Sequence, residues 1–285
     1  MARWFQRHDH RGERVFVLAG GGNLGAAQSG QLLELLKAGI VPDRIIGCSV
    51  GALNGTFIAL EPTVARAVAL VDIWKSGKVK DVFATTKLSI AFKIATKSDH
   101  LVDPMNLRRL IKTEIGVELL EQTKVPVEVL ATSLSTGRER WFERGPVIEV
   151  LCASTALPGV FPPVHLDGEL YVDGGVISPC PVGRAYLRKP AEVWILDTPE
   201  RPWELPAKLN ALEVLIRSFY VACRETDHQP EAPDRTRVFH LRTKIPEHIH
   251  LGFNDFNDFE QTGVLINAGE QSVQEALKTM SSNLI

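Results

Sequence analysis

The sequence has few cysteines, and none of them has the spacing of a metal site. The chain of 285 residues contains four, Cys48, Cys152, Cys180 and Cys223, without a C-x-x-C pair or a Cys/His cluster. This pattern is typical of neither a disulfide framework nor a zinc site. We therefore expect no metal ligands and a protein of the reducing cytoplasm.

Long apolar runs are also missing. The first run, Val15 to Ala19, leads directly into glycines and is too short for the hydrophobic part of a secretory signal. No uninterrupted apolar stretch reaches the ~18 residues that a membrane-spanning helix needs. We expect no membrane span, and peripheral contact with a membrane surface stays open.

Neither sign of charge is in excess. Lys and Arg number 32 and Asp and Glu number 34, which gives a formal net charge of -2. This balance argues against a protein that binds nucleic acid with its whole surface. A hydrophobic fraction of 45% excludes a disordered chain. The composition is that of a globular protein with one or two domains.

What is present is an alternation of short apolar runs and helical patterns. The runs predict strands at residues 14–19, 45–46, 125–132, 170–172, 192–196 and 238–241. Helical spacing occurs around residues 32–36, closed by Gly39, and over 205–224 and 259–280. The first strand, helix and strand imply a right-handed crossover and a parallel sheet. With no repeat or obvious linker, we predict a single α/β domain whose first dozen residues are disordered.

One segment, residues 75–112, departs from the charge balance. It carries nine Lys or Arg against three Asp, a net of +6 that leaves -8 for the rest. Leu88 and Phe92 recur there at helical spacing, with Lys93 and Lys97 on the opposite face. Two interpretations stay open: a lid that touches anionic membrane surfaces, or a helix that packs on the core with solvated lysines.

The first pattern that indicates chemistry is Gly47-x-Ser49-x-Gly51, where a strand ends and a helix of small residues begins. This is the context of a nucleophile elbow, whose strained serine needs a glycine on each side. Ser49 would lie at a helix N-terminus, where the dipole favours negative charge. The alternative is a tight turn without chemistry. Cys48, between Gly47 and Ser49, is expected to be buried in a packing role.

The second pattern is Gly20-x-Gly22-x-x-Gly25, which follows the first strand. It also fits a dinucleotide-binding loop, but that function needs an acidic residue at the end of the second strand. Asp43 precedes that strand, and Ser49 occupies its end. The other interpretation is an oxyanion hole made of backbone N–H groups.

A nucleophilic serine needs a base. None of the histidines considered has a sequence context that points to Ser49; these are His165, His228, His240, His248 and His250. A better candidate is Asp173, because an apolar run delivers this carboxylate into the turn Asp173-Gly174-Gly175. The alternative is an aspartate that only caps its own turn.

These motifs, in this order, resemble those of the patatin-like phospholipases. Gly20-Gly21-Gly22-Asn23-Leu24-Gly25 is similar to the oxyanion loop of that family, and Gly47-Cys48-Ser49-Val50-Gly51 to its elbow. The stretch from Ala153 through Pro163 is similar to its internal block, and Asp173-Gly174-Gly175 to its aspartate motif. Each motif is common alone, whereas the ordered set over residues 14–186 is specific.

The resemblance implies a three-layer α/β/α sandwich with a mainly parallel central sheet. It implies a core over residues 14–186, which contains the 75–112 segment, and a remainder over 187–285 that completes the same domain. It implies a lipid acyl hydrolase with a Ser49–Asp173 dyad and an oxyanion hole at Gly20, Gly21, Gly22, Asn23 and Gly25. No cofactor, metal or nucleic acid is implied, and the partner is a lipid or small ester substrate.

Two departures accompany the resemblance. The family usually has Arg or Lys at the position of Leu24, and commonly Asn near Ser178, where this chain reads Ser178-Pro179-Cys180-Pro181. Neither removes a dyad residue or a loop glycine. Two other functions stay open: an acyltransferase of the malonyl-CoA:acyl-carrier-protein transacylase type, for which no partner histidine or arginine is evident, and a binding protein on a hydrolase scaffold.

Overall fold

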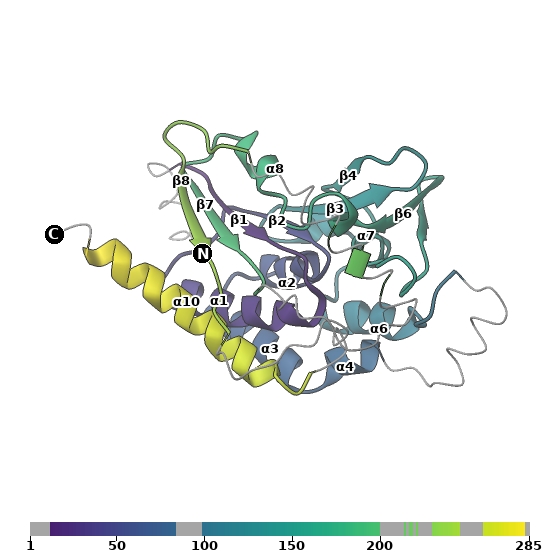
Figure 1. The fold of residues 1–285 in the computed structure, drawn as a ribbon, viewed down its shortest axis with the longest axis horizontal. Coiled ribbons are helices and arrows are strands. Elements are labelled where there is room, and N and C mark those ends of the chain that lie inside the picture. The colour runs from purple at the N-terminus through teal and green to yellow at the C-terminus, as the bar shows by residue number, and fades with distance from the viewer. Residues whose placement is uncertain are drawn as a thin grey trace.

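A computed structural model of the protein describes residues 12–83, 99–199, 230–245 and 259–282, together with residues 214, 217, 218 and 221. Within these ranges one eight-stranded sheet forms the centre of the molecule (Figure 1). Its strands are β1 (Arg14–Leu18), β2 (Arg44–Cys48), β3 (Val127–Ser133), β4 (Glu139–Phe142), β5 (Val164–Leu166), β6 (Glu169–Asp173), β7 (Glu192–Leu196) and β8 (Arg237–Leu241).

The sheet is mainly parallel, as the sequence predicts. Its strand order is β5-β6-β3-β2-β1-β7-β8, with β4 paired to β3 beside this path. The strands from β3 through β8 in this order are parallel, and β4, β5 and β6 pair antiparallel. Both β7 and β8 extend the sheet beyond β1, so residues from the last third of the chain share the sheet of the first.

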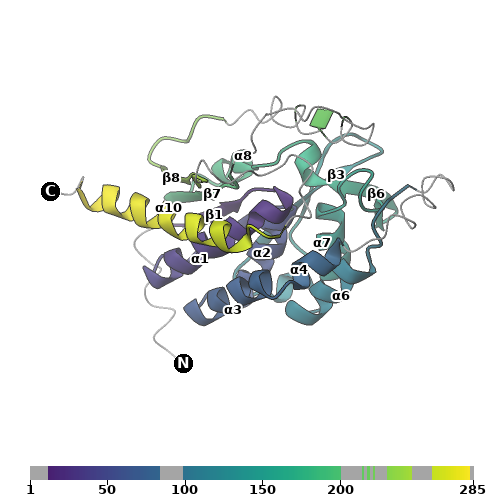
Figure 2. The ribbon, with the colours of Figure 1, turned by 60° about the horizontal axis from the view of Figure 1, so that its bottom comes forward.

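Helices cover both faces of the sheet, which confirms the three-layer arrangement. Figure 2 shows α1 and α3 below the sheet and α8 above it, with α10 crossing in front. The helices are α1 (Ala26–Lys37), α2 (Val50–Ala59), α3 (Val64–Lys75), α4 (Lys78–Val82), α6 (Met105–Glu114), α7 (Val147–Ser154), α8 (Val182–Tyr186) and α10 (Thr262–Ser282). Short 3-10 turns lie at Gly22–Gly25, Leu120–Gln122 and Gly174–Val176.

Strand β1 shows how the two faces are built. Phe16 and Leu18 point into the larger core, which α1, α2, α3, α7 and α10 cover. Val15 and Val17 point into a smaller core that includes Val182 of α8. These four side chains of β1 are fully buried. Because both faces are covered, the strand is a continuous apolar run rather than an alternating one.

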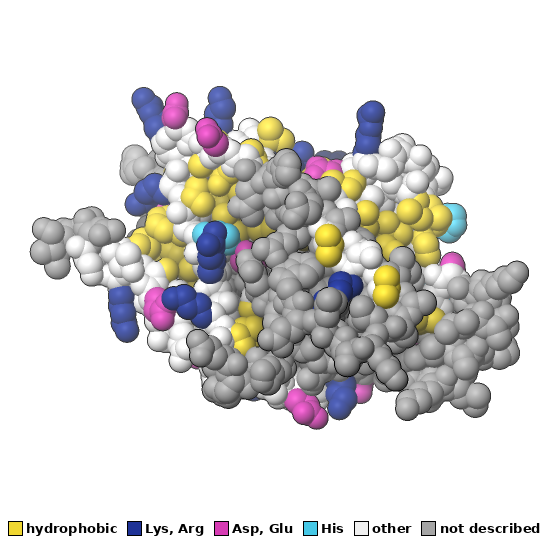
Figure 3. All heavy atoms as spheres, in the orientation of Figure 1, with side chains coloured by type: hydrophobic (Ala, Val, Ile, Leu, Met, Phe, Trp, Pro, Cys, Tyr) yellow, Lys and Arg dark blue, Asp and Glu magenta, His cyan; other side chains and the backbone are white. Residues whose placement is uncertain are grey.

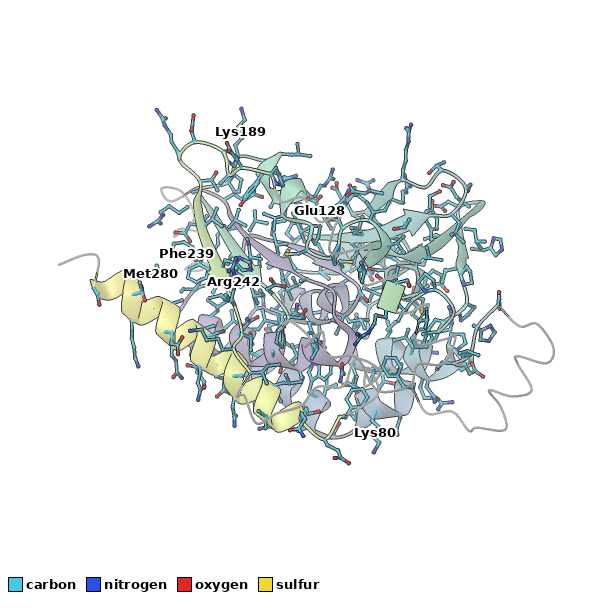
Figure 4. All side chains as sticks on the ribbon, viewed as in Figure 1. Lys80, Glu128, Lys189, Phe239, Arg242 and Met280 are labelled. Carbon is cyan, nitrogen blue, oxygen red and sulfur yellow. The ribbon has the colours of Figure 1, made fainter. Side chains whose placement is uncertain are left out.

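The described ends of the 75–112 segment pack on the core. Val82 of α4 and Leu107 of α6 are buried, whereas Lys80 is exposed on the outer side of α4 (Figure 4). The residues that carry the proposed apolar face, Leu88 and Phe92, lie outside the described residues, as do Lys93 and Lys97.

Other predictions differ from the structure in extent. The predicted helix at 259–280 is observed as α10, while residues 1–11 and most of 205–224 lie outside the described residues. Two strands, β4 and β5, were not predicted from the sequence, because both are short and partly exposed. Helices α3, α4, α6, α7 and α8 were not predicted either, and α4, α7 and α8 have only five to eight residues.

A buried ion-pair network joins β2 and β3 near their N-terminal ends, at the opposite end of the strands from Ser49. Glu128 of β3 is fully buried (Figure 4), and its carboxylate accepts hydrogen bonds from Arg44 at 3.2 Å and Arg184 at 2.5 Å. These contacts link β2, β3 and α8 across the sheet. The ion pairs offset the cost of burying the charge of Glu128.

Described charged side chains of neither sign predominate on the face of the molecule that Figure 3 shows. On the face that Figure 3 shows, described acidic and basic side chains are interspersed rather than gathered into a patch of one sign.

Among the described residues we find no helix with the length and apolar character needed to span a bilayer. The same residues contain no group of three or more His, Cys, Asp or Glu side chains placed to hold a metal ion.

Candidate active site

Ser49 occupies a strained turn between β2 and α2. Its backbone has φ 53° and ψ -125°, a conformation with positive φ that is unfavourable for a residue with a side chain. A Cβ atom at Gly47 would lie 2.7 Å from the Cα of Ala52, and one at Gly51 would lie 2.3 Å from the carbonyl oxygen of Leu18. The turn therefore has no room for a side chain on either flank of the serine.

Asp173 lies at the end of β6, and its carboxylate reaches this turn. Its Oδ2 accepts a hydrogen bond from Ser49 Oγ at 2.6 Å, and its Oδ1 accepts one from the N–H of Gly175 at 2.7 Å. The Sγ of Cys48 lies 3.9 Å from the same Oδ1. A Cβ at Gly174 would lie 2.5 Å from the carbonyl oxygen of Leu130, so the aspartate turn packs directly against β3. Two residues 124 positions apart in the sequence are thus in direct contact.

The surroundings of Asp173 change its acidity. Only 4% of the residue is exposed, and this burial raises the pKa of its carboxyl from 3.8 to about 6. The hydrogen bonds from Ser49, Gly175 and Cys48 act in the opposite direction and favour the charged form. A carboxylate whose pKa lies near 6 is ionised at neutral pH and is a stronger base than an exposed aspartate.

The glycine-rich loop passes directly beside Ser49. A Cβ at Gly20 would lie 3.3 Å from the Cβ of Ser49. The N–H of Gly20 donates to the carbonyl oxygen of Pro179 at 2.8 Å, and its own carbonyl oxygen accepts from Thr198 Oγ1 at 2.9 Å. At the other end of the loop, a Cβ at Gly25 would lie 2.4 Å from a methyl group of Val50.

The middle of this loop presents backbone donors. Gly21 and Gly22 have φ values of 154° and 60°. Within the described part of the chain, the N–H groups of these two glycines make no hydrogen bond. The side chains of Asn23 and Leu24 are buried, and Leu24 belongs to the larger core. Leu24, where the patatin-like family usually has Arg or Lys, is therefore a packing residue in this protein.

The structure adds a residue to which the sequence analysis gave no role. Ser154, at the end of α7, is fully buried, and its Oγ accepts the backbone N–H of Ser49 at 2.9 Å. The strained serine is therefore held from α7, and its N–H is already engaged. The only sequence signal was the position of Ser154 within the block from Ala153 to Pro163.

The described histidines lie elsewhere. His240 is within 2.9 Å of the Oδ2 of Asp197, and His165 is exposed on β5. His228, His248 and His250 lie outside the described residues. Asp43, considered for a nucleotide ribose, precedes β2 and accepts the backbone N–H of Arg14 at 2.8 Å. It is therefore at the opposite end of the strand from Ser49.

A cavity of about 290 Å³ lies beside α7. Its lining includes Arg108, Glu149, Cys152, Phe161 and His165. Cys152 and Ser154 are two residues apart on α7, so their side chains project from nearly opposite sides of the helix. Burial raises the pKa of Cys152 to about 11, which keeps it a neutral thiol. The cavity is distinct from the Ser49–Asp173 contact.

Comparison with known proteins gives consistent matches. The sequence model of one family, described as patatin-like phospholipase, matches residues 16–186. An uncharacterised NTE family protein of Mycobacterium tuberculosis is 30% identical over 168 residues, which are 59% of this chain and 44% of that protein. The neuropathy target esterase sws of Drosophila melanogaster is 23% identical over 290 residues, covering 92% of this chain and 19% of that protein.

These relatives are longer than the region matched, since the alignments span less than half of each. Among solved structures, VipD from Legionella pneumophila superposes with a TM-score of 0.51. The superposition covers 94% of this chain and 67% of VipD at 13% sequence identity, so the likeness concerns the fold.

Proposed function

The chain belongs to the patatin-like phospholipase family, and from this premise we propose that it is a serine acyl hydrolase that cleaves carboxylic esters of lipids. The observation that carries the proposal is the 2.6 Å hydrogen bond from Ser49 Oγ to Asp173 Oδ2, made at a strained turn between a strand and a helix. A hydroxyl bound to a buried carboxylate is the arrangement that a nucleophile and its base require.

In the proposed reaction, Ser49 Oγ attacks the ester carbonyl carbon while its proton passes to Asp173 Oδ2. The carbonyl oxygen becomes an oxyanion, which accepts hydrogen bonds from the N–H groups of Gly21 and Gly22. The C–O bond to the alcohol then breaks, and the alcohol leaves with the proton from Asp173. Water, with Asp173 again as base, attacks the acyl-enzyme and releases the acid.

Most of the barrier reduction must come from charge stabilisation. A carboxylate with a pKa of about 6 is still a far weaker base than a serine alkoxide, so proton transfer alone contributes little. One oxyanion donor is worth ~10²–10³ in rate, and helix α2 begins immediately after Ser49 with its positive end at the reacting centre. Ser154 engages the N–H of Ser49, and we therefore assign the oxyanion to the N–H groups of Gly21 and Gly22.

Two other functions remain as alternatives to the proposal. An acyltransferase of the malonyl-CoA:acyl-carrier-protein transacylase type would pair its serine with a histidine, whereas the partner of Ser49 is Asp173. Transfer of the acyl group to a thiol acceptor at a rate above hydrolysis would favour that enzyme. A binding protein on the same scaffold would retain ester and never turn it over.

The proposed substrate is a lipid or small ester, and the proposed location is the cytoplasm with peripheral contact at anionic membranes. The net charge of +6 over residues 75–112 supports the membrane contact, and its described part includes the exposed Lys75, Lys80 and Lys112. Co-sedimentation with vesicles should increase with anionic lipid and decrease with salt. Co-sedimentation that does not change with anionic lipid or with salt would contradict the proposed membrane contact.

The activity itself is tested with a matched pair of serine variants. We expect Ser49→Ala to lower hydrolysis of a short-chain p-nitrophenyl ester by at least about 10³-fold, because the nucleophile is lost. The control is Ser29→Ala, which removes another buried hydroxyl, one that donates to the carbonyl oxygen of Ala26 in α1. Hydrolysis that persists in Ser49→Ala would overturn the assignment of Ser49 as nucleophile. If the wild type is active and Ser49→Ala is not, a screen of lipid classes with the variant as blank identifies the substrate class.

A further inference from the structure

The glycine-rich loop is held at both ends by a pair of buried side-chain amides. Gln28 of α1 is fully buried, and its Nε2 donates to the carbonyl oxygen of Ala19 at 2.8 Å and to that of Leu196 at 3.0 Å. Asn54 of α2 is 3% exposed, and its Nδ2 donates to the carbonyl oxygen of Gly25 at 3.0 Å. Ala19 immediately precedes the loop and Gly25 is its last glycine.

The two amides also bind each other and a third helix. Asn54 Nδ2 donates to Gln28 Oε1 at 3.0 Å, and Asn54 Oδ1 accepts the indole N–H of Trp74 of α3 at 3.1 Å. Both amide nitrogens and both amide oxygens therefore have partners. A fully satisfied buried polar network is rigid, because each alternative arrangement would leave a buried group unpaired.

The network lies on the helix that carries the nucleophile turn. Asn54 is in α2, which begins directly after Ser49, so one helix positions both the serine and the end of the loop. The N–H groups of Gly21 and Gly22, between the two anchored ends, make no hydrogen bond within the described residues. Donors that stabilise an oxyanion act best when their positions are fixed before the reaction.

We propose that Gln28 and Asn54 are positioning residues that fix the glycine loop relative to Ser49, so that the N–H groups of Gly21 and Gly22 meet the oxyanion without reorganisation. This inference rests on the proposed acyl hydrolase function. Neither residue reaches the reacting atoms; each acts through the backbone of the loop.

The chain offers a matched control on the same helix. Gln31 is also fully buried, and its Nε2 donates to the carbonyl oxygen of Leu241 at 3.0 Å and to Thr243 Oγ1 at 3.1 Å. Two longer contacts, both at 3.4 Å, join it to Ser272 Oγ and the carbonyl oxygen of Asp197, so none of its acceptors belongs to residues 19–25. Gln28→Met and Gln31→Met each replace a buried amide by an apolar side chain of similar shape. Both should lower the melting temperature, so stability alone does not separate them.

Catalysis and loop exchange separate them. We expect Gln28→Met to lower kcat of the full chain about 10- to 100-fold with little change in KM, since a small misplacement of catalytic groups costs about that much. Gln31→Met should keep kcat. In hydrogen–deuterium exchange of the unliganded protein, amides of residues 19–25 should exchange faster in Gln28→Met than in wild type or Gln31→Met.

A milder variant guards against failure to fold. Trp74→Phe keeps an aromatic ring and removes the donor to Asn54 Oδ1, so a several-fold loss of kcat and faster exchange over residues 19–25 are expected. If these variants lose stability but keep wild-type kcat and loop exchange, the inference is overturned. If the wild type itself hydrolyses no ester, the proposed function fails, while the exchange measurement still decides whether the amides hold the loop.

Discussion

Replacing the proposed base by its neutral isostere should make the protein more stable. Asp173 is buried, and that burial raises the pKa of its carboxyl from 3.8 to about 6. At neutral pH the folded protein must therefore hold a charge that its environment disfavours. In an Asp173→Asn variant, the new amide can still accept the N–H of Gly175 through its oxygen and donate to Ser49 Oγ through its nitrogen, without that charge.

The size of the gain follows from the two pKa values. A difference between about 6 and 3.8 corresponds to about 3 kcal/mol of unfolding free energy above pH 6, at 1.36 kcal/mol for each pH unit. Hydrogen bonds to an amide are weaker than those to a carboxylate, which offsets part of this gain. We expect Asp173→Asn to be more stable than wild type by about 1–3 kcal/mol, a rise in melting temperature of roughly 2–10 °C.

The pH dependence gives the prediction its specificity. A carboxyl with a raised pKa binds a proton more tightly when folded, so its stabilising contribution is full below pH 3.8 and is lost as the pH rises through 6. Asp173→Asn has no such group. The advantage of the variant should therefore be absent near pH 3.5, grow between pH 4 and 6, and stay constant above.

The assay is thermal or urea unfolding of both proteins across pH 3.5 to 8, with ester hydrolysis measured in parallel. Asp43→Asn, a change at a half-buried aspartate at the other end of β2, controls for removal of a carboxylate as such. The reasoning is refuted if Asp173→Asn is less stable than wild type at pH 8, or if its advantage is the same at every pH.

Two further predictions concern the same site. The value of kcat/KM should rise with pH through an apparent pKa near 6 and level off above pH 7, because Asp173 must be ionised to accept the proton. A kcat/KM that is constant between pH 5 and 8 would contradict the role of Asp173 as base. Ser154→Ala should lower the free energy of unfolding by about 1–3 kcal/mol and should lower kcat, because the N–H of Ser49 loses its acceptor. Chemical denaturation and steady-state kinetics measure the two effects, and an unchanged kcat would show that Ser154 does not hold the nucleophile.

The sequence predicted the sheet well because its strands are continuous apolar runs. Residues 14–19 and 192–196 are buried on both faces, which leaves few alternatives to a parallel sheet. The short strands β4 and β5 were not predicted, because each has few residues and a partly exposed face, so no pattern distinguishes it from a loop. Helix α7 is too short for a helical period to be recognised.

The site divides in a similar way. The nucleophile turn could be predicted from the sequence because it requires glycine at positions 47 and 51. At both positions a Cβ atom would lie within 3 Å of neighbouring backbone atoms, so the requirement is visible as a Gly-x-Ser-x-Gly motif. Ser154 and Gln28 cannot be read in this way. Their contacts run between helices and loops that only the assembled fold brings together, and a serine or glutamine in a helix has many other uses.

The central claim, that Ser49 is the nucleophile and Asp173 its base, is tested most directly by covalent labelling. The purified protein is treated with a fluorophosphonate, and the modified residue and the labelling rate are determined by mass spectrometry. We predict one adduct, on Ser49, absent from Ser49→Ala and formed at least about 10²-fold more slowly in Asp173→Asn. An adduct on another residue, or none on the wild type, or an unchanged rate in Asp173→Asn, would contradict the account.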